Sequence, residues 1–417
     1  MFKRLFYIGL LGMVVLAVVP VMAEQMEITV LENVLEGLEP EEIVAEFEAL
    51  YPQIKVNLVQ SPDMNLQETL TTWLLGGIAP DIFVGWRVFP IEWALNGFLL
   101  ELDPYIEKYM TDEDIAEYAP AQYQFINVQG KQYGIPKYMG TVATYYNRRL
   151  FAEAGIPEPT RDTWTWETLR NTAMKLTVRD GMEIKRYGFF TLYNYDRINY
   201  WIRQGGGYIQ RPDRPNEVAI NEPEALAALE FLYRLAHEDQ VYLIDWWPAD
   251  EKFAGEHLAI WEEGVWSLKR ICDTGMDPSH IGICELAVGP GGRASLVNND
   301  VFVVNSGAKH PEAAFLFLRF ITSPEINARR AQSGLVPATR STAGSWIQYA
   351  ADTFKLPAQH LMSFIYAADY AYTAPIFNNQ GLVDQYFKEI CDRIFVFGES
   401  PTGVINSVIS ALNAIVK

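Results

Sequence analysis

A tryptophan and an arginine follow directly after an apolar segment. Residues 82–84 form a continuous apolar run of the buried parallel-strand type, and Gly85, Trp86 and Arg87 come next. A sugar ring presents flat C–H faces that stack on aromatic side chains, and hydroxyl groups that need fixed donors and acceptors. We therefore predict that Trp86 and Arg87 contact a sugar. The alternatives are a place in the hydrophobic core for Trp86 and a surface ion pair for Arg87.

Two further segments combine aromatic and polar side chains. Asn194 and Trp201 belong to the stretch 193–201, in which tyrosine, asparagine, aspartate and arginine are dense. Such a stretch is typical of a ligand-lining segment, although an amphipathic helix face explains it equally well. Trp246 and Trp247 are adjacent, and neighbours on a strand face opposite ways, so at most one of them points at a single ligand. We place this pair in a loop beside the site.

Metal and phosphate chemistry find little support in the sequence. The chain has three cysteines and five histidines, without a zinc-binding spacing, so we predict neither a metal nor a cofactor. The glycine clusters at 205–207 and 289–292 do not open a helix after a strand, and we interpret them as turns. Cys272 and Cys284 flank a turn-rich segment and either form a disulfide or stay free thiols.

Alternating strands and helices are predicted from the N-terminus onward, in the order strand, helix, strand, helix, strand. This order is typical of βαβ units and of a parallel sheet with helices on both faces, so the predicted fold class is α/β. The pattern restarts after residue 140. Predicted strands span 26–30, 54–59, 82–84, 141–146, 187–192, 258–260, 281–283 and 301–304, and predicted helices span 40–50, 66–75, 223–236 and 311–320.

Length and charge bound the function. A chain of 417 residues suits two domains, and a net charge of −19 argues against nucleic acid or an anionic membrane as partner. Lys3 and Arg4, the apolar run 5–19 and the small residues up to Ala23 predict a signal peptide over residues 1–23. A membrane anchor is the alternative, for which the run is short. No cysteine follows the cut, so we expect a periplasmic protein rather than a lipoprotein.

Five blocks of sequence carry a resemblance to a known family. They are GGIAPDI at 76–82 with ALNGFL at 94–99, GKQYGIP at 130–136, YNRRLF at 146–151 with AGI at 154–156, WTWE at 164–167, and GEHLAI at 255–260 with GVW at 264–266. In this order the blocks resemble those of the family 1 extracellular solute-binding proteins of ABC importers, of which maltose-binding protein is a familiar member. Each block is weak alone, and the ordered set is strong.

The resemblance implies a type II periplasmic-binding-protein fold. Two α/β lobes, each a mostly parallel sheet flanked by helices, would be joined by crossings near residues 139–140, 298–299 and 322–323. Lobe one would comprise 24–139 plus 299–321, and lobe two 140–298 plus 322–417. Ligands of open parallel sheets bind beyond the carboxyl ends of the strands, so two facing lobes would enclose a ligand in the cleft between them.

The resemblance also implies further ligand contacts. Crossing segments face the cleft in this family, and the aromatic residue that closes the GVW block stacks on the ligand from lobe two. A late segment of lobe two adds another aromatic contact. The residues at these positions are Lys137, Tyr138, Thr141, Trp266, Asn298, Asn299, Asp300, Tyr370, Tyr372 and Asn378.

The function that the resemblance implies is capture of a sugar, an oligosaccharide or glycoside, by a monomer that closes by hinge motion and delivers it to an ABC permease. The same fold could instead hold a non-sugar solute such as a glycerol-phosphate diester or a polyamine. A secreted glycoside hydrolase or lyase would need two carboxylates about 5 to 9 Å apart, and the nearest candidates, Asp245, Glu262 and Glu263, show no acid motif. Tyr145 and Tyr146 resemble a ferric-iron pair, but Tyr146 already belongs to a family block.

Overall fold

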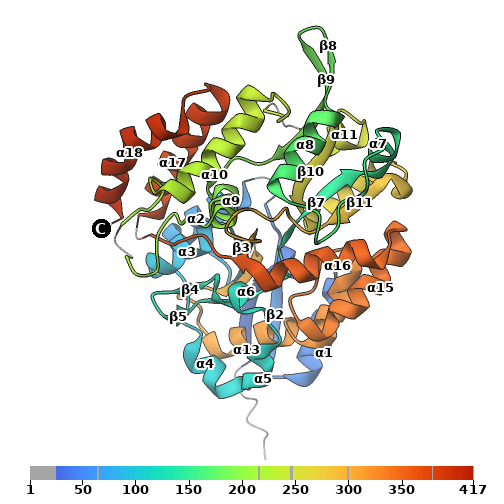
Figure 1. Ribbon diagram of the computed structural model, residues 1–417. Helices are drawn as coiled ribbons and strands as arrows, with labels where there is room; N and C mark the ends of the chain where they lie inside the picture. The colour runs from blue at the N-terminus through green and yellow to red at the C-terminus, as the bar shows by residue number, and fades with distance from the viewer. Residues whose placement is uncertain are drawn as a thin grey trace, which may run out of the picture.

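Two five-stranded sheets form the centre of the molecule (Figure 1). The computed structural model describes residues 25–62, 65–214, 217–244, 248–297, 300–377 and 379–416. The predicted signal peptide, Trp246, Trp247, Asn298, Asn299 and Asn378 lie outside these residues. The first sheet has the strand order β2 (Ile54–Val59), β1 (Met26–Leu31), β3 (Ile82–Trp86), β13 (Asp300–Val304) and β6 (Gly134–Pro136).

The first sheet is built from the predicted βαβ units. β1 pairs in parallel with both β2 and β3, and α1 (Pro40–Leu50) and α2 (Leu66–Gly76) connect these strands. β13 runs antiparallel between β3 and β6. Ile82, Phe83 and Val84 are completely buried, because elements cover both faces of the sheet, as their continuous apolar run predicts.

The second sheet has the order β11 (Ile281–Cys284), β7 (Val142–Asn147), β10 (Leu258–Gly264), β9 (Glu183–Thr191) and β8 (Val178–Asp180). β10 is parallel to β9, whereas β7 is antiparallel to both β10 and β11. The hairpin of β8 and β9 projects from the top of the molecule in Figure 1. Two short pairs complete the strands: β4 (Asn127–Val128) with β5 (Lys131–Gln132), and β12 (Ser295–Leu296) with β14 (Ala371–Tyr372).

The remaining helices divide between two hydrophobic cores. Helices before β7 and directly after β13 pack on the first sheet, and helices after β7 together with the C-terminal helices pack on the second. Ile326 and Ala338, beyond the expected end of lobe one at residue 321, also join the first core. The helices are α3 (Phe89–Leu95), α4 (Asp103–Tyr109), α5 (Asp112–Ala116), α6 (Pro120–Gln124), α7 (Arg148–Glu153), α8 (Trp166–Leu176), α9 (Tyr195–Gly205), α10 (Pro223–Tyr233), α11 (Ala249–Ala254), α12 (Leu268–Asp273), α13 (Pro311–Ile321), α14 (Pro324–Arg330), α15 (Ala343–Phe354), α16 (Ala358–Ala367), α17 (Gln380–Cys391) and α18 (Pro401–Ile415).

The two sheets face each other across a short connection. β6 ends at Pro136 and β7 begins at Val142, and five residues span at most about 18 Å. A second segment runs beside this crossing, since the Met139 N–H donates to the Val336 carbonyl at 2.8 Å and Tyr138 forms a bridge with Pro337. The sheet edge at which β6 ends therefore lies opposite the edge at which β7 begins.

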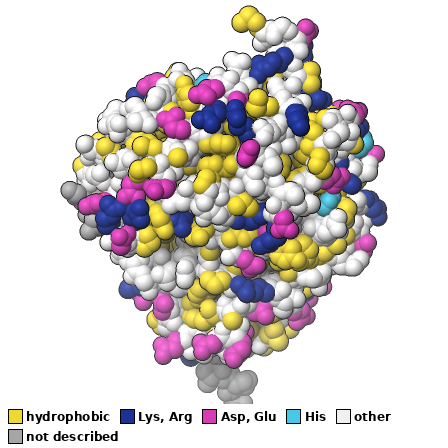
Figure 2. Space-filling view, viewed as in Figure 1, with side chains coloured by type: hydrophobic (Ala, Val, Ile, Leu, Met, Phe, Trp, Pro, Cys, Tyr) yellow, Lys and Arg dark blue, Asp and Glu magenta, His cyan; other side chains and the backbone are white. Residues whose placement is uncertain are grey.

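Most predicted elements are confirmed with shifts of a few residues. The helix predicted over 223–236 is α10, which continues in a wider π turn over Arg234–Glu238. Cys272 and Cys284 form no disulfide and are free thiols. Acidic and basic side chains are interspersed over the face shown in Figure 2, which displays no basic stripe.

Candidate ligand site between the two sheets

The end of β3 forms one wall of the space between the sheets. Trp86 is half-buried, and its backbone N–H donates to the Gln67 side-chain oxygen of α2 at 3.2 Å. The Gln67 amide in turn donates to the Val84 carbonyl at 3.2 Å, so α2 fixes this strand end. Arg87 follows with φ of 57°, a left-handed conformation that is rare for arginine, and its side chain is exposed.

Charged and phenolic groups continue this wall at the starts and ends of neighbouring strands. Asp300, which pairs with Trp86 across the sheet, has a pKa raised by burial to about 6, and Lys137 opposes that rise. The Tyr138 hydroxyl is a hydrogen-bond partner of this carboxyl. Lys137 is 1% exposed and its Nζ lies 2.5 Å from Glu36 Oε2, whose pKa it lowers. The predicted crossing thus supplies a buried cation and a phenol.

The opposite wall belongs to the second sheet. β9 leads into α9, where the Asn194 side chain accepts from the Arg197 N–H at 3.0 Å and caps the helix. Arg197 Nη2 lies 2.5 Å from Glu263 Oε1 at the end of β10, and both side chains are buried. The Arg197 guanidinium carbon is 5.8 Å from the centre of the Trp266 ring. Trp266 is half-buried on the turn after β10.

Side chains from both walls meet in a small pocket. Arg87 Nε lies 4.0 Å from Asp196 Oδ2. This contact connects the end of β3 in the first sheet with α9, which packs on the second sheet. Burial raises the pKa of Asp196, and Arg87 opposes that shift. Asp384 of α17 lines the same pocket, and its pKa is raised to about 6 by burial and by the charge of Asp196. The pocket holds about 30 Å³, enough for a water molecule.

A larger cavity adjoins this pocket. It has a volume of about 370 Å³, within the range of small-molecule sites, and shares Arg87, Tyr195 and Asp384 with its neighbour. Asn194 and Lys388 also line it. The cavity therefore extends from Arg87 after β3 and Asn194 before α9 toward α17.

The structure brings two of the predicted site residues, Arg87 and Asn194, into one cavity. Trp86 lies at the end of β3 next to Arg87, Trp266 lies on the turn after β10, and Tyr138 is 5% exposed in the crossing. Their contacts with a ligand stay predictions.

Thr141 and Trp201 correct the sequence-based site. Thr141 is 2% exposed and donates its hydroxyl to the Phe364 carbonyl at 2.6 Å, so it anchors the crossing to α16. Trp201 is fully buried, with ring centres 5.2 Å from Trp166 and 5.9 Å from Phe231. Its indole serves the core of the second sheet, because it lies seven residues beyond the cap, about 10 Å along α9.

Tyr372 lies apart from the facing tryptophans. It is 39% exposed in β14, and the Arg203 guanidinium stacks 4.5 Å from its ring centre. Tyr372 lines an open pocket of about 550 Å³ next to α6, so its ligand contact stays a prediction. Trp246, Trp247 and Asn299 are outside the described residues.

Sequence reasoning missed Glu36 and Asp384 as residues of this space. Glu36 follows the short helical turn after β1, so its position just beyond a strand end could have indicated it as a site residue. Asp384 lies on a C-terminal helix with no motif, and only packing brings it to Arg87.

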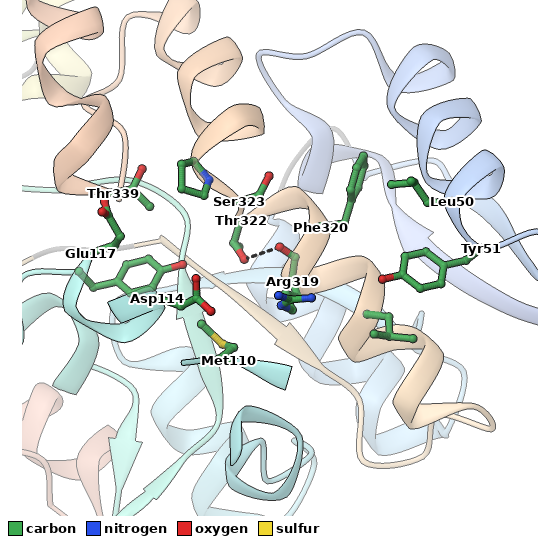
Figure 3. A pocket seen from close by; sticks show the side chains of 13 residues that line it. Leu50, Tyr51, Met110, Asp114, Glu117, Arg319, Phe320, Thr322, Ser323 and Thr339 are labelled. Atoms are coloured by element: carbon green, nitrogen blue, oxygen red, sulfur yellow. Dashed lines mark hydrogen bonds between the residues drawn. The ribbon is translucent and has the colours of Figure 1, made fainter. Parts of the chain in front are cut away.

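A separate pocket lies among the helices of the first hydrophobic core (Figure 3). It has a volume of about 310 Å³ and lies between the end of α1 and the end of α13. Its carboxylates already have protein partners: Asp114 accepts from the Thr111 N–H at 2.9 Å, and Glu117 accepts from the Ser341 N–H at 2.9 Å. We therefore do not assign the ligand to this pocket.

Among the described residues, no group of histidine, cysteine and carboxylate side chains has the arrangement of a metal site. Over the same residues, no helix combines the length and apolar character that crossing a bilayer requires.

Comparison with a family model matches residues 35–328 of the chain to the model described as bacterial extracellular solute-binding protein. A maltotriose-binding protein of Pyrococcus abyssi is 23% identical over 295 residues, which cover 68% of this chain and 59% of that protein. The match thus spans less than two thirds of that relative's length.

Two solved structures share the fold over nearly the whole chain. An ABC substrate-binding protein of Listeria monocytogenes in complex with cycloalternan has a TM-score of 0.78 at 24% identity and covers 94% of this chain and 98% of its own. UgpB of Mycobacterium tuberculosis in complex with glycerophosphocholine has a TM-score of 0.76 at 19% identity, with coverage of 93% and 98%. The fold is therefore the two-lobed, type II fold that the sequence blocks predict.

Proposed function

The chain belongs to the bacterial extracellular solute-binding proteins, and on that premise we propose that it captures an oligosaccharide or glycoside between its two lobes for an ABC importer. The observation that carries this proposal is the cavity that Arg87, next to Trp86 at the end of β3, lines together with Asn194 at the start of α9. Trp266 lies beside Arg197 in the first turn of the same helix. Stacking on two aromatic rings contributes about 1 kcal/mol each, and several hydrogen bonds contribute about 1 kcal/mol each. Such a sum is compatible with micromolar binding, which needs about 8 kcal/mol net.

The relatives support a sugar as ligand. The Pyrococcus abyssi relative is a maltotriose-binding protein, and an arabinooligosaccharide-binding protein of Bacillus subtilis is 24% identical over 313 residues. The Listeria monocytogenes structure holds cycloalternan. In this chain, Asp300, Tyr138 and Asn194 provide the hydroxyl-binding donors and acceptors beside the tryptophans.

Closure of the two lobes around the ligand completes the proposed cycle. The crossing at residues 137–141 and the segment beside it act as the hinge, and lobe one comprises about residues 24–139 plus 299–321. The Arg87–Asp196 contact spans the space between the lobes and favours the closed form. A ligand drives closure only if it binds the closed form better than the open form. The closed lobes then present the surface that the permease recognises.

Export, assembly and the absence of catalysis belong to the same proposal. Residues 1–23 direct the chain to the periplasm, where it acts as a monomer. Glu262 and Glu263 are neighbours on β10 and so point to opposite faces of the sheet. Tyr200 binds the first at 2.7 Å and Arg197 the second at 2.5 Å, which does not suit a pair of carboxylates acting on one bond.

A glycerol-phosphate diester is the second candidate ligand, and the likeness to UgpB favours it. The cations of the cleft argue for a neutral sugar instead. Lys137, Arg197 and Lys388 each already have a carboxylate within 2.6 Å, which leaves Arg87 with its 4.0 Å contact for a phosphate.

The proposal is tested by thermal-shift measurements with glucose, maltose, maltotriose, arabinotriose and glycerophosphocholine. We expect an oligosaccharide to raise the melting temperature, and Trp266→Ala to abolish that rise while leaving the melting temperature without ligand within a few degrees. Stabilisation by glycerophosphocholine alone would overturn the sugar assignment. An unchanged response of Trp266→Ala would remove this tryptophan from the site.

A further inference from the structure

A buried ion pair lies directly beneath the lobe-two tryptophan. Arg197 is 3% exposed and Glu263 is 5% exposed, and Arg197 Nη2 is 2.5 Å from Glu263 Oε1. Burial favours the neutral form of Arg197, but Glu263 outweighs this effect and raises the pKa of the guanidinium overall. The Arg197 guanidinium therefore stays charged beside Glu263. Buried pairs of this kind stabilise a fold little compared with apolar residues of similar volume, so a second role is worth seeking.

The pair is tied to the backbone that carries Trp266. Glu263 Oε1 also accepts from the Gly264 N–H at 2.7 Å, and the Tyr145 hydroxyl donates to the Gly264 carbonyl at 3.0 Å. The Trp266 ring rests on the same glycine, since a methyl group there would lie 2.2 Å from a ring carbon. Any movement of Glu263 would therefore shift the support on which the indole lies.

Arg197 reaches the ring from a different element. Its guanidinium carbon is 5.8 Å from the Trp266 ring centre, within the range of a cation–π contact. The capped start of α9 fixes its backbone, because Asn194 accepts from the Arg197 N–H. Trp266 is thus held by the turn after β10 and by the first turn of α9.

The neighbours of Arg197 extend this support into the core. The Tyr200 hydroxyl donates to Glu262 Oε2 at 2.7 Å and lies 2.8 Å from Thr191 Oγ1. Within the described residues, Arg197 Nη1 is buried and has no hydrogen-bond partner. Tyr200 also interacts with the Arg197 guanidinium and, together with Glu263, raises its pKa. The shortest contact of Arg197 is with Glu263, and Trp266 lies beside its guanidinium.

We propose that Arg197 and Glu263 are positioning residues that hold the Trp266 ring in its ligand-stacking orientation, and that Arg197 acts on the ligand only through Trp266. This inference rests on the proposed function, because it takes Trp266 as a ligand contact.

A double-mutant cycle separates action through Trp266 from general destabilisation. The variant is Arg197→Met with Glu263→Gln, which removes both charges and so avoids a buried unpaired ion. The matched control is Arg170→Met with Asp239→Asn, because Arg170 and Asp239 form an ion pair at 2.6 Å on the far side of α8. Affinity is measured by calorimetry for maltotriose and for the best oligosaccharide of the thermal-shift panel, in the native chain and in the Trp266→Ala background.

With Trp266 present, we expect the Arg197 and Glu263 changes to weaken binding about five- to tenfold, because this is the effect of losing one aromatic contact. In the Trp266→Ala background, we expect the same changes to have little further effect on binding. The control should leave affinity unchanged. Independent, multiplying effects of the two sites would show that Arg197 does not act through Trp266 and would overturn the inference.

A second readout needs no ligand. With 5-fluorotryptophan incorporated, the ¹⁹F resonance that disappears in Trp266→Phe belongs to Trp266. We expect this resonance to shift or broaden on changing Arg197 and Glu263, and to stay in place in the control. An unchanged resonance overturns the inference whether or not a sugar binds. A shifted resonance in a protein that binds no carbohydrate supports the positioning role and overturns the proposed function instead.

If the paired variant does not fold, Arg197→Lys is measured in the same way. Lysine keeps the charge but lacks the planar guanidinium that faces both Glu263 and the ring, so the Trp266 resonance should still move. Identical resonance and affinity in Arg197→Lys would overturn the inference.

Discussion

Two tryptophans show how much the surroundings decide at the scale of single residues. Trp266 follows a strand end, rests on Gly264 and remains half-buried at the edge of the second sheet. Trp201 has no exposed surface and packs against Trp166 and Phe231. Residue type predicts an aromatic surface for both, but only a strand-end position places that surface where a ligand can reach it.

Gly264 provides the first prediction at this scale. We expect Gly264→Ala to displace the Trp266 ring, because the added methyl would lie 2.2 Å from a ring carbon, and to destabilise the protein by about 1 to 3 kcal/mol. Urea unfolding measures the stability, and calorimetry the loss of oligosaccharide affinity. Gly344→Ala is the matched control: no atom lies within 4 Å of its added methyl on α15, so it should be neutral or slightly stabilising. Equal behaviour of the two variants would contradict the close approach at Gly264.

Asp384 gives a pH prediction with a defined sign. Burial and the neighbouring Asp196 raise its pKa to about 6, whereas an aspartate in the unfolded chain titrates near about 4. Between these values the folded state binds more protons than the unfolded state, so the free energy of unfolding contributed by this group falls as pH rises through about 4 to 6. Asp384→Asn should remove this fall. Urea titrations across this window check it, and identical pH profiles for both proteins would refute it.

At the scale of elements, α9 explains why one stretch of sequence served two roles. Asn194 caps its start at the facing edge, and Arg197 follows in its first turn beneath Trp266. The helix then runs back over the second sheet, which takes Trp201 into the core. The interpretation of residues 193–201 as a ligand-lining segment therefore applies to the start of α9, and the interpretation as an amphipathic helix face applies to its later turns. The reason is that a helix that follows a parallel strand begins at the ligand edge of the sheet and then runs away from that edge.

The cap of α9 supplies a prediction at this scale. Asn194→Ala should destabilise the protein by about 1 kcal/mol and weaken oligosaccharide binding, because the loosened first turn carries Arg197. Ser400→Ala is the matched control, since Ser400 caps α18 through the Gly403 N–H, away from the facing edges. Ser400→Ala should lose a similar amount of stability in urea unfolding, and calorimetry should show an unchanged oligosaccharide affinity. An unchanged oligosaccharide affinity in Asn194→Ala would show that the helix cap does not support the ligand site.

At the scale of the whole molecule, the two sheet edges are held opposite each other by the crossing and by contacts across the space. Arg87 and Asp196 form such a contact, and their side chains are 53% and 29% exposed. A pair exposed to this degree adds little to the stability of either lobe. Its effect belongs instead to the balance between open and closed arrangements.

We therefore expect Arg87→Ala to change stability by less than about 1 kcal/mol but to shift the ligand-bound protein toward the open form. Small-angle scattering with saturating oligosaccharide should show a larger radius of gyration, and stopped-flow kinetics a faster dissociation. Lys185→Ala is the control, because its pair with Glu183 at 2.6 Å lies on the projecting hairpin. The same scattering profile for Arg87→Ala and the native protein would contradict an interlobe role for this contact.

The sequence by itself determined the elements and their order. The alternation around residues 54–59, the apolar run at 82–84 and the helical spacing at 40–50 each report on a few consecutive residues, and the structure confirms all three. The ordered family blocks added the two-lobed fold. A strand end then pointed to Trp86 and Arg87, because the carboxyl edge of a parallel sheet follows from the strand direction. Trp266 was indicated by the family resemblance, as the aromatic residue that closes the GVW block.

Only the tertiary structure decided which distant side chains meet. Asp384 comes to Arg87 through the packing of α17, and Arg197 finds Glu263 across 66 positions of sequence. Burial likewise separates Trp201 from Trp266, although their residue type is the same. Local periodicity carries no information about such pairs, because their proximity depends on how whole helices pack against the sheets rather than on the spacing of neighbouring residues.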